Sequence, residues 1–115
     1  MSLYRHKAGA RLAEAVVSNG LIFMAGQVPE NVDADAEAQT ANVLAQIDTL
    51  LAELDSSKAK LVDATIYLAD LADYAAMNAA WDAWVIPGQT PARATVQAKL
   101  ANPAWKVEIK IVAER

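Results

Sequence analysis

The chain has 115 residues, of which 55% are hydrophobic, and it carries a net charge of −4 at pH 7. This length is typical of one domain with one core, here residues 1–115, and the acidic balance argues against a nucleic-acid partner. The chain lacks cysteine, an apolar signal region and any apolar run near the ~20 residues of a membrane span, which excludes disulfides and predicts a cytoplasmic protein outside membranes.

The N-terminal part has the pattern of a β-hairpin. Two apolar runs, residues 15–18 and 21–25, flank Asn19-Gly20, and this dipeptide between apolar runs is the strongest short-range hairpin signal. Pro29 closes the second strand because proline has no N–H for a strand ladder. A further short strand is expected near Tyr4.

A helix is predicted from residue 36 to residue 54. Asp33 or Asp35 can cap its first turn, since a carboxylate accepts hydrogen bonds from free N–H groups there. Apolar residues recur at spacings of three and four, which is typical of a helix with one buried face. Gln39 falls outside this apolar stripe, so we expect it on the polar side.

The second half alternates strand and helix. Residues 61–68 predict a strand, residues 74–85 a helix, a strand follows Pro91, and the last strand spans residues 105–113. The apolar stripe of the second helix predicts a set of core residues, which are Tyr74, Met77, Ala80, Trp81 and Trp84. The order β-β-α-β-α-β-β predicts an α+β fold in which two helices cover one face of a mixed sheet.

The last two strands alternate between apolar and polar side chains. In the first of them Ala94, Val96 and Ala98 are expected on the buried face. The polar side chains are expected together on the helix-free face, against water or another subunit; they are Arg93, Thr95, Gln97, Lys106, Glu108 and Lys110. A guanidinium such as that of Arg93 is costly to bury alone, so it meets either a carboxylate of the protein or an external anion.

Several segments, in order and in register, resemble the Rid (YjgF-type) family of enamine/imine deaminases. They are Gly26–Pro29, Gln39-Thr40, Asp63–Asp70, Met77-Asn78, Pro91–Val96 and Lys106–Ile109. The chain is most similar to the YoaB-like branch, through Ala41-Asn42, Trp81–Trp84 and residues 107–113.

This resemblance implies a chorismate-mutase-like fold and a homotrimer with active sites between subunits. It also implies an activity, the hydrolysis of 2-imino acids to 2-keto acids and ammonia. These imines come from enamines that PLP-dependent dehydratases release. Neither a metal nor an organic cofactor is expected.

The resemblance also assigns site residues. Arg93 matches the arginine that holds the substrate carboxylate, and Glu108 matches the glutamate that orients or activates water. Further matches to substrate-binding positions are Thr95, Ala25, Gly26 and Asn78. Leu12 and Lys110 depart from the best-known branch, where an aromatic and an acidic residue stand.

Other interpretations remain for the same residues. Arg93 suits an intersubunit salt bridge, Glu108 a cross-strand charge pair, and Asn78 a cap or an intersubunit hydrogen bond. A non-catalytic sensor of small carboxylates, or a module that protects other proteins, would use the same trimeric scaffold. A ribonuclease, an activity attributed to some relatives, is opposed by the acidic charge and the absence of a basic track.

Overall fold

The N-terminal part is a three-stranded antiparallel ribbon in the computed structural model, which describes residues 3–115. Its strands are β1 (Tyr4–Ala8), β2 (Ala13–Ser18) and β3 (Leu21–Met24). Asn19 (φ 51°) and Gly20 (φ 77°) between β2 and β3 both adopt the left-handed conformation that a two-residue hairpin turn demands. The predicted hairpin and the extra strand near Tyr4 are both confirmed.

The long helix α1 (Ala36–Glu53) starts at the predicted residue and ends one residue early. Asp35 caps it, because its carboxylate accepts a 2.9 Å hydrogen bond from the Ala38 N–H. The predicted apolar stripe is buried, with Ile47 and Leu51 fully enclosed.

Gln39 contradicts the sequence prediction, because it is completely buried rather than on the polar side of α1. Its side-chain N–H₂ donates to the backbone carbonyls of Ala34 and Ala104, and its carbonyl accepts from the Lys106 N–H at 2.8 Å. Gln39 therefore joins the loop before α1, at Ala34, to the loop before β6, at Ala104 and Lys106. A polar residue is tolerated here since both ends of its amide are hydrogen-bonded.

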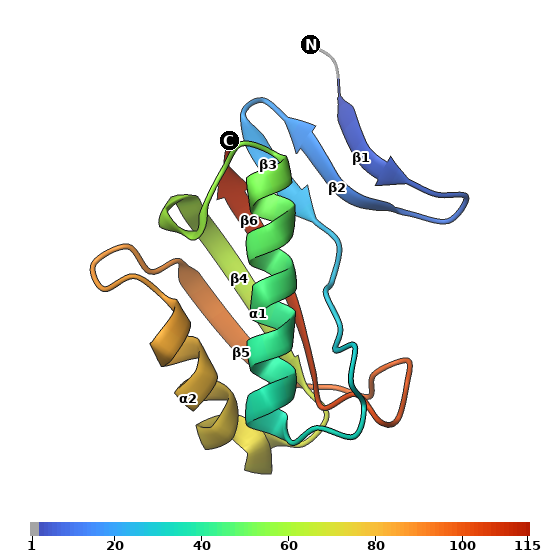
Figure 1. Ribbon diagram of the computed structural model, residues 1–115, viewed down its shortest axis with the longest axis vertical. Helices are drawn as coiled ribbons and strands as arrows, with labels where there is room; N and C mark the ends of the chain where they lie inside the picture. Colours follow the sequence, from blue (N-terminus) through green and yellow to red (C-terminus); the bar gives the residue numbers. More distant parts are fainter. Residues whose placement is uncertain (1–2) are drawn as a thin grey trace.

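The remaining elements follow the predicted order. They are β4 (Leu61–Leu68), α2 (Tyr74–Trp84), β5 (Ala92–Gln97) and β6 (Val107–Glu114), with short 3₁₀ turns at Lys58–Lys60 and Leu71–Asp73. The six strands form one sheet in the order β1-β2-β3-β6-β4-β5, in which only β4 and β5 are parallel. Figure 1 shows α1 and α2 side by side on one face of this sheet, which confirms the predicted α+β arrangement.

The core lies between the two helices and the sheet face that they cover. Its fully enclosed side chains come from every layer and include Ile22, Met24, Ile66, Met77 and Ile109. The opposite face of the sheet has no covering helix, and it exposes Phe23 (42%) and Val96 (43%). In residues 3–115, no helix combines the length and the apolar character that crossing a membrane requires.

The two faces of β5 are the reverse of the prediction. Arg93 and Thr95 lie in register with Ala64 and Ile66 of β4, whose side chains are fully buried beneath the helices. Ala94 and Val96 instead point to the open face. Alternation separates the faces of a strand but does not say which face is covered. Here α2 covers the polar one.

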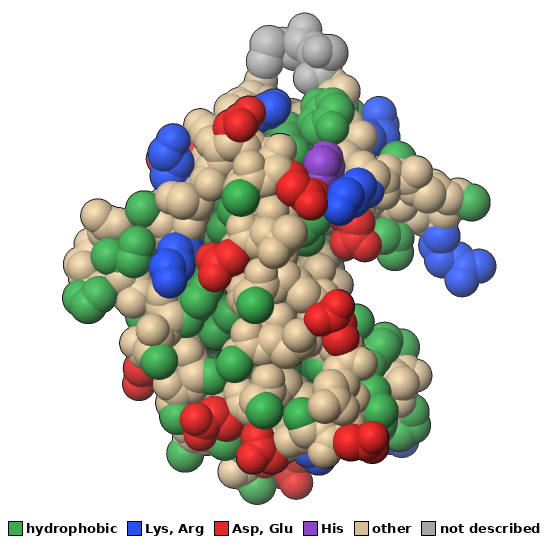
Figure 2. Space-filling model, in the orientation of Figure 1, with side chains coloured by type: hydrophobic (Ala, Val, Ile, Leu, Met, Phe, Trp, Pro, Cys, Tyr) green, Lys and Arg blue, Asp and Glu red, His purple; other side chains and the backbone are tan. Residues whose placement is uncertain are grey.

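A polar cluster ties the edge strand β1 to the last turn of α1. His6 Nε2 lies 2.8 Å and Lys7 Nζ lies 3.1 Å from the Glu53 carboxylate, and the Tyr4 hydroxyl lies 3.0 Å from His6 Nδ1. The hydrogen bond with His6, followed by that from Lys7, holds the pKa of Glu53 below its usual range. Figure 2 shows the single histidine between acidic and basic side chains on this side of the molecule.

Candidate functional site

Arg93 lies on the edge strand β5 with its side chain under α2. Its Nη1 donates to Asn78 Oδ1 at 2.8 Å, and its Nη2 donates to the Tyr74 hydroxyl at 3.2 Å. The guanidinium carbon lies 5.3 Å from the centre of the Trp81 ring and 5.9 Å from that of Tyr74, within range of cation–π attraction. Within residues 3–115 Arg93 takes part in no ion pair, so its charge is held by neutral groups alone.

The helix α2 supplies this setting through its spacing. Tyr74 and Asn78 are four residues apart and Trp81 follows three later, which places all of them on one side of the helix. Tyr74 was predicted to be in the core, but it is 45% exposed because its hydroxyl reaches the rim of the sheet beside Arg93. The tyrosine–asparagine spacing was the sequence signal for its role.

Thr95 lies two residues beyond Arg93 and on the same face of β5. Its hydroxyl oxygen is buried and lacks a hydrogen-bond partner among the described residues. Such a group costs about 1–3 kcal/mol relative to a satisfied one. The predicted pair Arg93 and Thr95 is therefore brought together, with Asn78 as a direct partner of the arginine.

Glu108 lies on the opposite face of the sheet, where it pairs in register with Tyr67. Gly26 lies directly against it, since a Cβ added there would be 2.9 Å from the Glu108 carboxyl carbon and closer still to Oε2. Two backbone hydrogen bonds between Gln27 and Ile109, of 2.8 Å and 3.1 Å, hold the segment at this distance. A side chain at position 26 would therefore displace the carboxylate from this position.

Ala25 and Gly26 continue from β3, and their backbone is fixed within the chain. The Ala25 N–H donates to the Glu14 carbonyl at 2.8 Å, and its own carbonyl accepts from Gln27 Nε2 at 3.0 Å. Gln27 is buried and also donates to the Glu14 carboxylate at 3.2 Å. Glu14 carried no signal in the sequence, and Gln27 was marked only as part of the segment Gly26–Pro29, because the roles of both depend on contacts between strands.

Lys110 follows Glu108 by two residues on the same face of β6. Its Nζ donates to the Met24 carbonyl at 2.8 Å, which draws the ammonium toward β3. Like Arg93, it takes part in no ion pair within residues 3–115.

The structure therefore brings the predicted residues together as two half-sites rather than one. The first half-site consists of Arg93, Thr95 and Asn78, and the second of Glu108, Gly26 and Ala25. Two strand spacings and three residues separate Arg93 from Glu108 in the sheet, which amounts to about 14 Å between their Cα atoms. Their side chains also point to opposite faces, so the expectation of a shared face is wrong.

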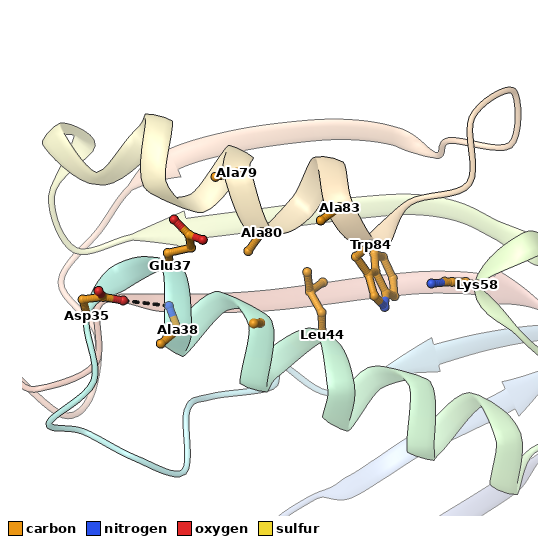
Figure 3. Close-up of a pocket in the computed structure, with 10 residues that line it drawn as sticks. Asp35, Glu37, Ala38, Leu44, Lys58, Ala79, Ala80, Ala83 and Trp84 are labelled. Atoms are coloured by element: carbon orange, nitrogen blue, oxygen red, sulfur yellow. Dashed lines mark hydrogen bonds between the residues drawn. The ribbon is translucent and has the colours of Figure 1, made fainter.

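The hollows of the surface lie elsewhere. One of about 560 Å³ runs between α1 and α2 (Figure 3), with Asp35 and Glu37 at one end and Trp84 and Lys58 at the other. A second, of about 410 Å³, separates the protruding β1–β2 hairpin from α1. Neither contains Arg93 or Glu108. Among residues 3–115 no three carboxylates or histidines are grouped to hold a metal ion.

Comparison with known proteins gives consistent matches over almost the whole length. A family model described as Endoribonuclease L-PSP matches residues 4–115. The RutC family protein YoaB of Escherichia coli K12 is 57% identical over 113 residues, which are 98% of each protein. The crystal structure of NMB1025 from Neisseria meningitidis, a member of the YjgF protein family, is 56% identical with a TM-score of 0.95, covering 100% of this chain and 96% of that one. A Yersinia pestis protein of the conserved Rid protein family, YyfA, is 29% identical with a TM-score of 0.86, covering 94% and 90%.

Proposed function

The chain belongs to the Endoribonuclease L-PSP family, also called the YjgF or Rid family, and on that premise we propose that it hydrolyses reactive 2-imino acids to 2-keto acids and ammonia. Membership confirms the resemblance inferred from the sequence, including the likeness to YoaB. The observation that carries the proposal is the state of Arg93, whose guanidinium is held in place by neutral partners and pairs with no carboxylate among residues 3–115.

Arg93 is the proposed anchor of the substrate. A guanidinium presents a planar fork that matches a carboxylate with two parallel hydrogen bonds. Asn78 and Tyr74 take up one hydrogen on each terminal nitrogen, which fixes the fork without neutralising its charge. A small 2-imino acid has its carboxylate as its main recognisable group, so this arrangement suits that class.

Glu108 is the proposed residue that orients and activates water. Its carboxylate lies against the backbone at Gly26, so its position is restricted on one side. A base of this kind needs to be within hydrogen-bond reach of the water and ionised at working pH. Much of the rate gain is expected from positioning, since an imine carbon is already electrophilic.

The reaction balances without a cofactor. The imine reacts in its protonated form, taking a proton from solvent. The oxygen of water bonds to the carbon, the electron pair of the C=N double bond moves to nitrogen, and Glu108 accepts the proton that the water loses, which leaves an amino alcohol. Glu108 returns this proton to the nitrogen, the C–N bond breaks with its electron pair on nitrogen, and the hydroxyl proton leaves to solvent. Ammonia leaves and the carbon keeps its oxygen as the ketone of a 2-keto acid.

A second copy of the chain is needed to unite the two half-sites, because Arg93 and Glu108 lie on opposite faces of one sheet. We propose that three copies associate through the helix-free face, where Phe23 and Val96 are exposed. Closed symmetric rings are the usual outcome when unlike surfaces of identical chains meet. Each active site would then take Arg93 from one subunit and Glu108 from its neighbour, and residues 1–115 would act as one cytoplasmic Rid-type domain.

A coupled assay tests the activity. A PLP-dependent dehydratase generates 2-iminobutyrate, semicarbazide traps the imine that survives, and added protein competes with the trap. We expect the wild type to lower trapping strongly, Arg93→Lys to lose most of this effect, and Arg5→Ala, which removes an exposed arginine of β1, to retain it. A wild type that does not exceed spontaneous hydrolysis would contradict the proposal.

Glu108→Ala separates catalysis from binding alone. In a deaminase this variant loses turnover but still binds 2-oxobutyrate, the product, through Arg93. In a sensor or protective module it would leave function intact. Titration of single-stranded RNA at rising salt tests the nuclease alternative, for which binding should weaken steeply as salt increases. Because the chain has 14 acidic and only 10 basic residues, we expect no RNA binding.

A further inference from the structure

We propose that Lys110 forms a subsite for a second anionic group, so that the preferred substrates are 2-imino acids with a carboxylate in their side chain. This inference rests on the proposed function and extends it to a substrate class. Its basis is the position of the Lys110 ammonium beside Glu108, in the half-site where water is activated.

Lys110 is held in place without being neutralised. Its Nζ donates to the Met24 carbonyl at 2.8 Å, and an ammonium has three hydrogens, so two remain for another acceptor. No carboxylate within residues 3–115 pairs with it. A lysine fixed by a neutral carbonyl is a charge prepared for an anion, because less side-chain freedom is lost when the anion binds.

The ammonium and the carboxylate lie along the same boundary between β3 and β6. Lys110 is two residues from Glu108 on one strand, a distance of about 7 Å. Met24, which receives the ammonium, is two residues from Gly26, which contacts the Glu108 carboxylate. A substrate whose imine carbon is near Glu108 would direct its side chain along this boundary. Two or three carbon–carbon bonds of about 1.5 Å each, with the reach of the lysine, span the gap.

Arg93 and Lys110 then each bind one of the two carboxylates of such a substrate. Arg93 binds the one next to the imine, for which its fork is suited, and Lys110 binds the other as a point charge. A substrate with a short apolar side chain would leave the ammonium without an anion when the second subunit closes over it. Desolvating an unpaired ammonium is costly, so the site would favour the dianion.

Lys106 provides a matched control. It precedes Glu108 by two residues, immediately before β6 begins, whereas Lys110 follows Glu108 by two. Its backbone N–H donates to Gln39 and its carbonyl accepts from the Ala69 N–H, whereas its ammonium takes part in no hydrogen bond found within residues 3–115. Removing either lysine changes the net charge near Glu108 equally, so a general field effect would appear in both variants, whereas a subsite would depend on Lys110 alone.

The test compares two imines in the semicarbazide assay. An amino-acid oxidase with catalase generates 2-iminoglutarate from glutamate or 2-iminobutyrate from 2-aminobutyrate, and kcat/KM is measured for each. We expect the ratio of the dicarboxylic to the monocarboxylic imine to fall about tenfold or more in Lys110→Met, the loss expected for one charge-assisted hydrogen bond. Lys110→Arg should retain most of the ratio, and Lys106→Met should retain all of it.

Other outcomes refute the inference in distinguishable ways. If the wild type hydrolyses 2-iminobutyrate and shows no preference for 2-iminoglutarate, the subsite is wrong while the proposed function stands. If it accelerates neither imine, the proposed function fails and the subsite with it. An equal loss of ratio in Lys106→Met indicates a general charge effect. If Lys110→Met dissociates the oligomer in light scattering, Lys110 instead pairs with an acidic residue of another copy.

Discussion

Replacing Gly26 by alanine should abolish most of the activity while leaving the fold intact. Gly26 is not in the left-handed region, so its backbone accepts a side chain without strain. The obstacle is Glu108: an added Cβ would lie 2.9 Å from its carboxyl carbon and 3.2 Å from its Cγ. Unstrained carbon contacts are about 3.5–4.0 Å long. The carboxylate therefore has to retreat by about 1 Å.

The size of the effect follows from that displacement. A shift of about 1 Å in a reacting group can cost about 10²-fold in rate, which corresponds to ~2.7 kcal/mol in the activation free energy. The free energy of unfolding should change by less than about 1 kcal/mol. The displaced group is the flexible end of a half-exposed side chain, and alanine also restricts the unfolded chain slightly.

The assay is kcat for 2-iminobutyrate, measured together with urea unfolding. Gly9→Ala is the stability control, because a Cβ there meets only the Leu12 carbonyl at an ordinary 3.5 Å. A double-mutant cycle with Glu108→Ala then tests the route of the effect. If Gly26 acts through Glu108, Gly26→Ala costs nothing more once the carboxylate is gone. A full additive loss in the double variant would refute this reasoning.

Three further predictions concern other parts of the chain. Asn78→Ala should raise KM about tenfold and change kcat less, because Arg93 loses the acceptor that lies 2.8 Å from its Nη1. A fall in kcat at constant KM would contradict an anchoring role. Asp35→Ala should lower the free energy of unfolding by about 1 kcal/mol through loss of the α1 cap, measured by urea denaturation, and no change would mean that water replaces the cap. The pKa of Glu53 is lowered in the folded state, so its bonds with His6 and Lys7 stabilise β1 above the ordinary carboxyl pKa and are lost as the pH falls through the lowered one. The protection factors of the β1 amides, which are corrected for the intrinsic pH dependence of exchange, should fall over that pH range in the wild type but not in Glu53→Gln, and equal profiles would refute the link.

Local signals predicted most of the fold. The Asn19-Gly20 turn, the Asp35 cap and the apolar stripe of α1 each depend on residues close in sequence, and the structure has all three. The order of elements limited the helices to one face of the sheet, because two helices cannot cover both.

Long-range contacts decided what the sequence could not. The buried amide of Gln39 bonds to the loop at Ala104, which lies 65 residues later in the chain, so no local pattern revealed it. The sides of β5 were assigned wrongly because α2 covers Arg93 and Thr95 rather than Ala94 and Val96. The resemblance selected the candidate residues, but only the sheet register revealed that Arg93 and Glu108 belong to different faces.

The division of the two half-sites has a consequence for mixtures of damaged chains. A chain without Arg93 keeps an intact Glu108 face, and a chain without Glu108 keeps an intact Arg93 face. In the proposed trimeric assembly, a homotrimer of either variant would be inactive, yet unfolding and reassembling the two together would create interfaces with one intact face from each parent. If equal amounts of the two variants mix at random in a ring of three, about a quarter of the interfaces combine an intact Arg93 with an intact Glu108. Two inactive variants would thus complement each other, and a mixture of the two chains would regain part of the activity.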